Sequence, residues 1–305
     1  MAVIMVGDAG SLRRCLSRLV PQISGKPIEV LVPFDNTVED LGGLRREFPE
    51  LTFLDLGKVR TVARPGTVEA QHELFDKRIS AVFAAGRGEK MALLQDWGAP
   101  AADWCERLIE AESLPYAAVG GAVENEGQGV LNWAVYFLDF GRHQLPLVEG
   151  PVRFLSDVNI VYSRQALEAV RGLWERRYNE VIVNWALAAR GEVLWRKPSM
   201  VVYQDRGRLS LSALVRERLS WGKIFGAARA HELSLARLLP YILLSPLIPC
   251  VIALRVARKV LSGRRNRLMF LRAFPAFFLL TVFWSLGELW GYLSRKPSPL
   301  GEDSG

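Results

Sequence analysis

The sequence predicts an α/β fold, with a mostly parallel sheet flanked by helices, followed by amphipathic and membrane-embedded helices. Two observations carry this prediction. The first part of the chain alternates between short apolar runs of strand length and runs with helical spacing, and two long apolar runs stand near its end beside many arginines. Alternating β and α units favour a parallel sheet covered on both faces. Basic residues next to apolar helices favour an anionic membrane surface.

The alternation can be followed through residues 1–95. Ser11 is expected to cap the first helix. The expected strands are residues 3–6, 27–34, 51–57 and 90–95, and the expected helices are 11–20, 38–48 and 72–88. In parallel sheets, ligands bind beyond the carboxyl ends of the strands. Three of the expected strands offer an acid at that edge, namely Asp8, Asp35 and Asp96.

Cysteine and histidine usage excludes several classes of site. The 305 residues include three cysteines, Cys15, Cys105 and Cys250, which are far apart and form no CxxC spacing. This spacing argues against a disulfide framework or a cysteine-based zinc site. The three histidines are also scattered, which argues against a histidine metal cluster. The short apolar run MAVIMV at residues 1–6 has no basic flank, so we interpret it as a strand and not as a signal peptide.

Charge is distributed unevenly along the chain. The net charge is −4 over residues 1–205, +12 over 206–272 and −1 over 273–305. No nucleic-acid-binding motif accompanies the basic block, so anionic membrane lipids, and not nucleic acid, are the expected partner. The apolar runs beside it are 238–254 and 273–293. Two buried helices of a soluble domain are the alternative interpretation.

The predicted membrane region has a topological conflict. Its linker, residues 255–272, carries seven basic residues and no acid, and the positive-inside rule keeps such a linker cytoplasmic. One pass through the first apolar run, which contains three prolines, would put the linker outside. We therefore expect both runs to re-enter or to lie in the interface. The expected organisation is a basic amphipathic interfacial segment at 206–237, two membrane-embedded segments within 238–295 and a disordered tail at 296–305.

Five ordered stretches covering roughly residues 1–230 resemble family 2 glycosyltransferases, which have the GT-A nucleotide-sugar fold. The tail WSLGELWGYL also resembles the membrane tail of some bacterial members. The five stretches are VGDAGSLRRCLSRLVPQ, PIEVLVPFDN, DKRISAVFAAGRGEKMALLQDWGAPAADWCERLIEA, FLSDVNIVYSRQAL and YNEVIVNWALAARGEVL.

The resemblance implies a catalytic, nucleotide-sugar-binding domain at residues 1–205. That domain would transfer a sugar, with inversion, from a nucleotide diphosphate sugar to a lipid-linked or membrane-proximal acceptor in polysaccharide or glycolipid synthesis. It also implies an inner or cytoplasmic membrane location, with the catalytic domain facing the cytoplasm, where such donors are found. The alternative is a catalytically silent GT-A-like scaffold or binding subunit of a membrane glycosylation complex.

Many family members carry an Asp-X-Asp motif that binds Mg²⁺ or Mn²⁺ at the donor diphosphate. This chain has Gln95-Asp96-Trp97 at that place, so only the middle acid is available as a carboxylate ligand. Three interpretations stay open. In the first, Asp96 is a metal ligand, and in the second, it hydrogen-bonds the donor's ribose or sugar. In the third interpretation, the enzyme has lost its activity.

The resemblance implies further site residues. Glu180 would be the catalytic base that takes the acceptor's proton, although an acid at a helix start is also favoured by the helix dipole. The donor would contact Asp8, Asp35, Arg78, Asp96, Asp157 and Asn159. For Asp35 the alternative is a turn residue, and for Arg78 a solvated helix charge. The segment that closes over the diphosphate or on the membrane side would include Arg218, Trp221 and Lys223. A basic amphipathic helix lying on lipid headgroups explains the presence of these three residues equally well.

Overall fold

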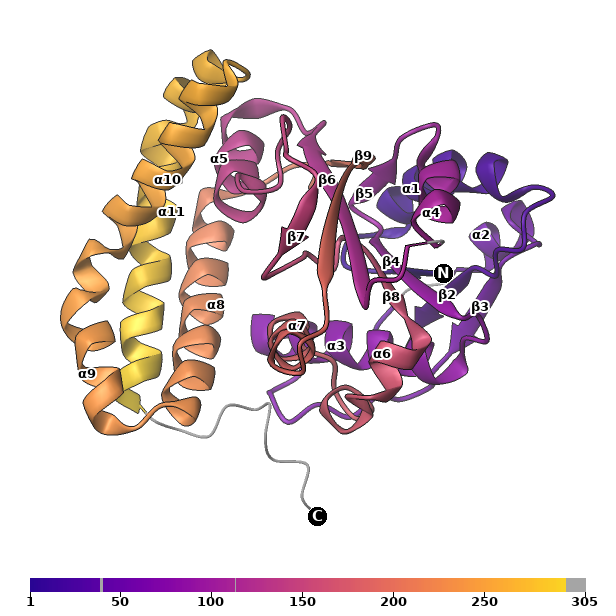
Figure 1. Ribbon diagram of the computed structural model, residues 1–305, viewed down its shortest axis with the longest axis horizontal. Helices are drawn as coiled ribbons and strands as arrows, with labels where there is room; N and C mark the ends of the chain where they lie inside the picture. Colours follow the sequence, from indigo (N-terminus) through magenta and orange to yellow (C-terminus); the bar gives the residue numbers. More distant parts are fainter. Residues whose placement is uncertain (39–40, 113, 295–305) are drawn as a thin grey trace. The chain divides into compact units, whose positions relative to one another are not determined.

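The computed structural model describes residues 1–38, 41–112 and 114–294, and the chain divides into two compact units (Figure 1). The α/β unit comprises residues 1–61, 70–126 and 143–205. The helical unit comprises residues 62–69, 127–142 and the chain from Arg206 onward. The predicted tail at 296–305 lies outside the described residues.

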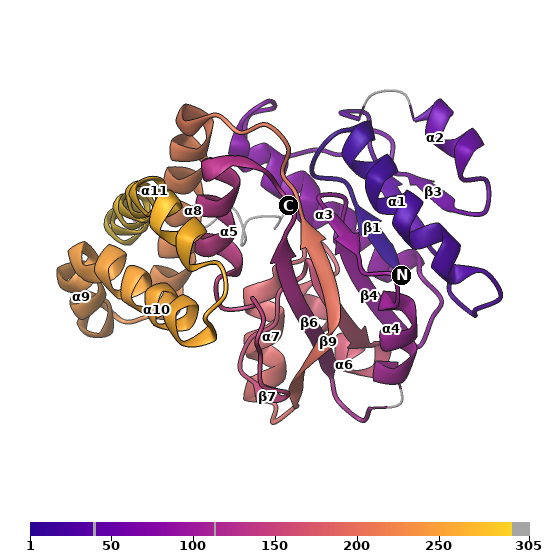
Figure 2. The same cartoon turned by 90° about the horizontal axis from the view of Figure 1, so that it is seen from above.

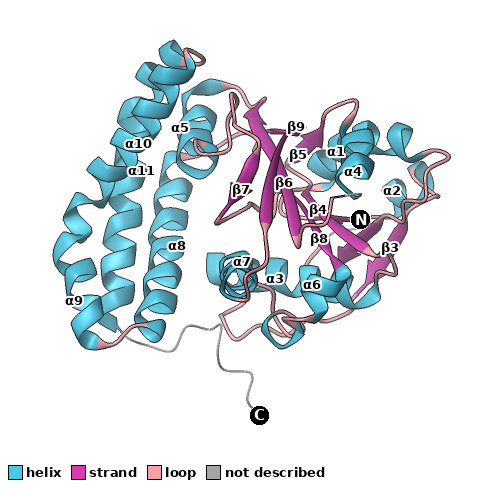
Figure 3. Cartoon of the chain, in the orientation of Figure 1, coloured by secondary structure: helices cyan, strands magenta, loops and turns pink. Residues whose placement is uncertain are grey.

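The α/β unit is built on a nine-stranded sheet, as far as the described residues go (Figure 3). Its order is β3-β2-β1-β4-β8-β6-β9-β5, with β7 beside β9. Strands β1, β2, β3, β4, β6 and β9 run in one direction and β5, β7 and β8 in the other, which confirms the mostly parallel sheet. The strands are β1 Ala2–Ile4, β2 Leu31–Phe34, β3 Thr52–Asp55, β4 Lys90–Gln95, β5 Gly98–Pro100, β6 Ala118–Asn125, β7 Gly150–Val152, β8 Asn159–Ser163 and β9 Leu194–Gln204.

Helices cover both faces of this sheet (Figure 2). Alternate residues of a strand point to opposite faces, so Val3 of β1 packs in the cluster with α1 and α4, whereas Ile4 packs in the cluster with α3, α6 and α7. The helices of this unit are α1 Ala9–Ile23, α2 Gly42–Glu47, α3 Val68–Ala85, whose first two residues are grouped with the helical unit, α4 Trp104–Glu112, α6 Arg164–Glu168, the 3₁₀ turn η1 Arg171–Leu173 and α7 Glu180–Ala189.

The predicted elements are present, but several boundaries differ. The first helix begins at Ala9, because the Asp8 side chain, and not Ser11, accepts the capping bond from the Ser11 amide at 2.8 Å. The helix also extends past the predicted end at residue 20, to Ile23, with Pro21 inside its last turns. The second strand begins only at Leu31. The fourth strand, Lys90–Gln95, has the predicted bounds.

The helical unit contains α5 Gly129–Phe140, α8 Leu211–Glu232, α9 Leu235–Leu244, η2 Ser245–Leu247, α10 Ile248–Gly263 and α11 Arg267–Ser294. In the part of the chain that the structure describes, the segments Leu235–Gly263 and Arg267–Ser294 are long and apolar enough to cross a membrane, by length and composition alone. The basic linker expected at 255–272 is mostly helical, because its residues extend α10 and begin α11, with only residues 264–266 between the helices.

Glycines bring α8 and α11 into backbone contact. A Cβ built on Gly222 would lie 2.2 Å from the Trp284 carbonyl oxygen, and one on Gly226 would lie 2.2 Å from that of Glu288. Gly287 and Gly291 face α8 in the same way. Each helix thus carries a GxxxG pair, a pattern that allows two helices to approach closely.

Candidate active site

The predicted acid of the Gln95-Asp96-Trp97 stretch lies at the carboxyl edge of the parallel strands, but it faces inward. Asp96 is fully buried, and its carboxylate accepts hydrogen bonds from the Val6 amide at 2.9 Å and from the Gly7 amide at 3.0 and 3.1 Å. Burial raises the pKa of Asp96 to about 7, and the amide hydrogen bonds act in the opposite direction. Asp96 therefore holds the loop that leads from β1 to α1.

Asp35 and Arg78 form a buried ion pair at the same edge. One oxygen of Asp35 lies 2.7 Å from a terminal nitrogen of Arg78 and the other accepts from the amide and hydroxyl of Thr37. Arg78 also donates to the carbonyl of Met5 at 2.8 Å. The pair therefore ties the end of β2 to the end of β1. A contact of either side chain with a nucleotide base stays a prediction.

Two other predicted donor ligands have structural roles. Asp8 is exposed and caps α1. Asn159 is buried inside the α/β unit, where its amide donates to the carbonyls of Ala122 and Met200 and its oxygen accepts from the Trp104 indole, each at 2.9 Å. The Asn159 side chain thus bonds the interior of the sheet. A contact of Asn159 with a donor sugar stays a prediction.

Glu180 and Asp157 meet at this edge of the sheet. Because β8 runs antiparallel to β4, with Asn159 opposite Leu94, the residues just before β8 lie beside the end of β4. There the Gln95 amide donates to Asp157 at 3.3 Å, and the Asp157 backbone N–H donates to Glu180 Oε2 at 2.8 Å. Glu180 is the first residue of α7, and the side chain of Asn179 caps that helix. Both carboxyl groups are half-buried.

The proximity of the two carboxyl groups is reflected in the protonation of Asp157. Dense packing of protein around Asp157 and the adjacent Glu180 carboxylate raise the pKa of Asp157 well above its usual value. Burial also raises the pKa of nearby Asp76 to about 7, although Arg177, whose Nε lies 2.8 Å from Asp76 Oδ2, acts in the opposite direction. A carboxylic acid beside a carboxylate is an arrangement in which one proton is easily shared.

Sequence reasoning missed Gln95 as a partner of Asp157, and it missed Asp76 and Arg177. Gln95 was noted only for lacking a charge. Asp76 lies on α3 and Arg177 lies 101 residues later in the chain. Nothing local marks such a pair, because neither residue interrupts the pattern of its own element.

The three residues predicted for closure all lie on α8 of the helical unit. Arg218 is buried there and forms ion pairs with Asp139 and Glu217. Lys223 is exposed and lies 5.3 Å from the centre of the Trp290 ring, and Trp221 is half-buried. Their role in closing over a donor stays a prediction.

The side chains at the sheet edge do not fit a metal held by the protein. Both oxygens of Asp96 face backbone amides, and a neutral amide and an indole flank it. Over residues 1–38, 41–112 and 114–294, no group of three or more His, Cys, Asp or Glu side chains is arranged to hold a metal ion. We therefore derive no catalytic step through a metal.

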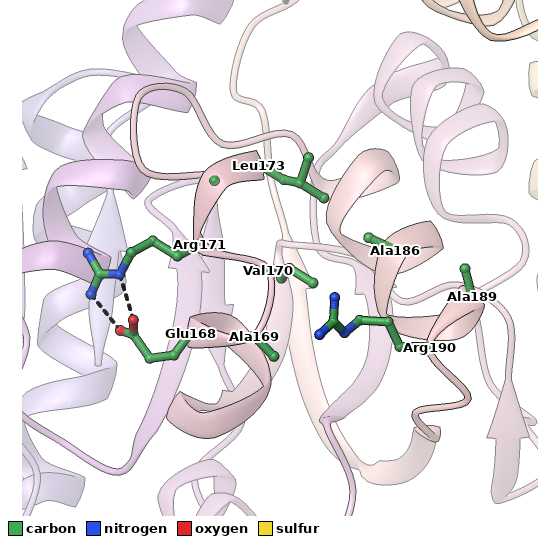
Figure 4. Close-up of a pocket in the computed structure, with 9 residues that line it drawn as sticks. Glu168, Ala169, Val170, Arg171, Leu173, Ala186, Ala189 and Arg190 are labelled. Carbon is green, nitrogen blue, oxygen red and sulfur yellow. Dashed lines mark hydrogen bonds and ion pairs between the residues drawn. The ribbon is translucent and has the colours of Figure 1, made fainter.

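The pocket drawn in Figure 4 lies elsewhere on the α/β unit, between the α6–η1 segment and the C-terminal half of α7. Arg171 on its wall is paired with Glu168, at 2.6 and 2.8 Å, and Arg190 lies at the end of α7. None of the residues predicted from the sequence lines this pocket.

Comparison with solved structures identifies the fold. No protein-family model and no curated protein sequence matches the chain. A mannosyltransferase from Pyrobaculum calidifontis, solved with GDP-mannose and Mn²⁺, aligns with a TM-score of 0.57 at 13% identity, over 95% of this chain and 86% of that chain. TarS from S. aureus, residues 1–349, aligns with a TM-score of 0.47 at 12% identity, over 94% and 89% of the two chains. The first likeness carries the conclusion, which confirms the prediction: the chain has the GT-A fold of glycosyltransferases.

Proposed function

We propose that the protein is a membrane-associated inverting glycosyltransferase that moves a sugar from a nucleotide diphosphate sugar to a lipid-linked or membrane-proximal acceptor. The pathway would be polysaccharide or glycolipid synthesis. The observation that carries this proposal is the placement of Glu180 at the carboxyl edge of a GT-A sheet, half-buried and hydrogen-bonded by the Asp157 amide at 2.8 Å. The P. calidifontis mannosyltransferase was solved with GDP-mannose, which supports a donor of this class.

In this mechanism Glu180 takes the proton of the acceptor hydroxyl as the hydroxyl oxygen attacks the anomeric carbon. The Asp157 amide fixes Oε2 of Glu180, so the carboxylate is oriented before the acceptor arrives. The bond between the anomeric carbon and the diphosphate breaks, and the nucleoside diphosphate leaves with the electron pair. Asp96 holds the β1–α1 loop at the edge where the nucleotide is expected.

Two properties of the helical unit support the membrane association. Its segments Leu235–Gly263 and Arg267–Ser294 are long and apolar, and much of the apolar side-chain surface of both is exposed. Residues 206–272 carry a large positive charge, which is attracted to the headgroups of anionic lipids. Because nucleotide sugars are cytoplasmic, we place the α/β unit on the cytoplasmic side of the membrane.

A donor screen tests the proposal. Purified protein is mixed with membrane lipids and one nucleotide sugar at a time, and release of nucleoside diphosphate is measured with and without EDTA. One donor is expected to give lipid-dependent release. EDTA decides whether a divalent cation, such as the Mn²⁺ present in the mannosyltransferase structure, is used here.

A different result would favour the second function. The neutral Gln95 and Trp97 and the inward-facing Asp96 are the observations that favour a silent scaffold. Saturable binding of a nucleotide sugar without release from any donor, in the presence of membrane lipids, would identify the protein as that scaffold and reject the enzyme.

A further inference from the structure

We infer that the helical unit is a monotopic membrane anchor, whose helices α9, α10 and α11 lie against one leaflet of an anionic bilayer and do not cross it. This inference rests on the proposed membrane association and specifies its geometry. It follows from which helices pack on one another inside the helical unit and from how those helices are connected in sequence to the α/β unit.

Helix α5 must stay on the same side of the membrane as the α/β unit. The segment that contains it, residues 127–142, is preceded and followed in sequence by residues of the α/β unit. The helix has 12 residues, which extend about 18 Å at 1.5 Å per residue. The hydrocarbon core is roughly 30 Å thick, so this segment cannot cross it and return.

The first half of α11 and the end of α10 pack on α5. Phe137 of α5 and Phe270 of α11 meet edge to face, with ring centroids 5.1 Å apart. Val256 and Val260 of α10 belong to the same buried cluster as Phe137. The turn at 264–266, between these helices, therefore lies on the side of the membrane that holds α5, which is the side of the α/β unit.

The second half of α11 is held in the same way by α8. Ser220 of α8 donates to Glu69 at 2.7 Å, and the short segment 62–69 that contains Glu69 is again enclosed in sequence by the α/β unit. The glycine contacts of Gly222 and Gly226 then join this part of α8 to the backbone of Trp284 and Glu288. Helix α11 thus has a protein partner along both halves.

The only acid within α11 confirms that this face of the helix is turned to protein. Glu288 is 3% exposed. It forms an ion pair with Arg229 of α8 at 3.1 Å and hydrogen-bonds the Trp284 indole at 3.2 Å. Tyr292 also donates to it. A charge in hydrocarbon is costly unless it is paired, and here the pair is formed within the helical unit.

The opposite faces of α9, α10 and α11 carry the surface that fits lipid. Large apolar side chains there are exposed, including Leu239, Leu243, Leu254 and Leu271. The turn between α10 and α11 and the helix residues next to it carry exposed arginines: Arg255, Arg258, Arg264, Arg265, Arg267 and Arg272. A helical unit that exposes both apolar side chains and a cluster of cations matches the acyl chains and anionic headgroups of a single leaflet.

Cysteine labelling distinguishes this anchor from a helical hairpin that crosses the membrane. In a Cys250→Ser background, where Cys15 and Cys105 are buried, one variant carries Ser262→Cys, beside the turn, and a matched control carries Glu175→Cys, exposed on the α/β unit. An impermeant maleimide is added to sealed and to permeabilised bacterial host cells. Both variants should be in the membrane fraction and should be labelled only after permeabilisation.

Two outcomes overturn the inference. Labelling of Ser262→Cys in sealed cells, with Glu175→Cys protected, would show a crossing hairpin. Recovery of the protein in the soluble fraction would show that the exposed apolar faces do not bind lipid. Donor turnover is measured on the same variants, so a protein that is labelled as expected but releases no nucleoside diphosphate contradicts the proposed enzyme and leaves the anchor standing.

The leaflet's charge is tested with vesicles of phosphatidylglycerol mixed with phosphatidylcholine. Arg264→Glu/Arg265→Glu/Arg267→Glu should weaken sedimentation with these vesicles on the order of a hundredfold or more, since each basic residue near the surface contributes several-fold to the affinity. The charge-matched control Arg46→Glu/Arg153→Glu/Arg190→Glu, on exposed arginines of the α/β unit, should bind as the unaltered chain does. Equal loss in both variants would reject the assignment of the anionic contact to this turn.

Discussion

Replacing Glu180 with glutamine separates the chemistry of this carboxylate from its structural role. The Oε2 atom of Glu180 accepts the Asp157 amide at 2.8 Å, and the amide oxygen of glutamine can accept the same bond. The like charge that raises the pKa of Asp157 disappears in the variant. The variant should therefore fold with a thermal midpoint no lower than that of the unaltered chain.

The expected loss is confined to turnover. A glutamine cannot take a proton at neutral pH, and a positioned general base contributes roughly 10²- to 10⁴-fold to a rate. The corresponding loss of transition-state stabilisation is about 2.7 to 5.4 kcal/mol, at 1.36 kcal/mol for each tenfold change. Donor affinity should be unchanged, because the base acts on the acceptor hydroxyl.

The assay follows transfer of radiolabelled sugar to membrane lipid under saturating donor, with donor affinity measured separately by calorimetry. Glu175→Gln is the matched control, because Glu175 is exposed and lies just before the same helix; it should keep full turnover. Turnover by Glu180→Gln within a few-fold of the unaltered chain would refute the assignment of Glu180 as base. A large fall in donor affinity would also refute it, since it would place Glu180 at the donor.

Three further predictions concern other parts of the chain. Asp96→Asn should weaken donor binding by about tenfold, because one of the acceptors for the Val6 and Gly7 amides is lost; calorimetry with and without EDTA checks it, and an effect of EDTA on binding would support a metal. Gly226→Leu should lower the free energy of unfolding of the helical unit by about 1–3 kcal/mol, because the new Cβ would lie 2.2 Å from the Glu288 carbonyl oxygen. In the same thermal melts Gly43→Ala, whose Cβ would meet no atom within 4 Å, should be neutral. The raised pKa of Asp157 means that folding favours its protonated form, so its stabilising contribution is fully present below its usual pKa and is lost as the pH rises through the raised pKa; Asp157→Asn should flatten that part of the stability profile in denaturant titrations at several pH values.

The fold could be predicted because its signals are local. Strand β1 alternates between the two buried faces of the sheet, and the four predicted strands up to residue 95 are all present. Each signal is contained within one short run of sequence, so a single sequence suffices to find it. The boundaries were less accurate where a cap decides them, as at Asp8, whose capping role depends on one hydrogen bond to the Ser11 amide.

The partners of the site residues could not be predicted, because they are distant in sequence. Asn159 bonds groups 37, 41 and 55 residues away, and Asp96 bonds amides 89 and 90 residues away. Both residues stand at the ends of strands, where polar side chains face either ligand or protein. The sequence indicates only that such a residue is polar, and the register of β4, β6 and β8 decides what it meets.

The neutral residues beside Asp96 are explained by the groups around them. Gln95 donates to Asp157, which lies against Glu180; an acid at position 95 would add a further negative charge beside that pair, whereas the amide stabilises it. Trp97 packs on Gly7, where a Cβ would lie 2.3 Å from the indole nitrogen, and its carbonyl accepts from Arg14 at 2.7 Å. The stretch for which the resemblance implied a metal motif thus stabilises the β1–α1 loop and supports the carboxyl pair, so donor binding in this chain should depend on Asp96 through the position of that loop.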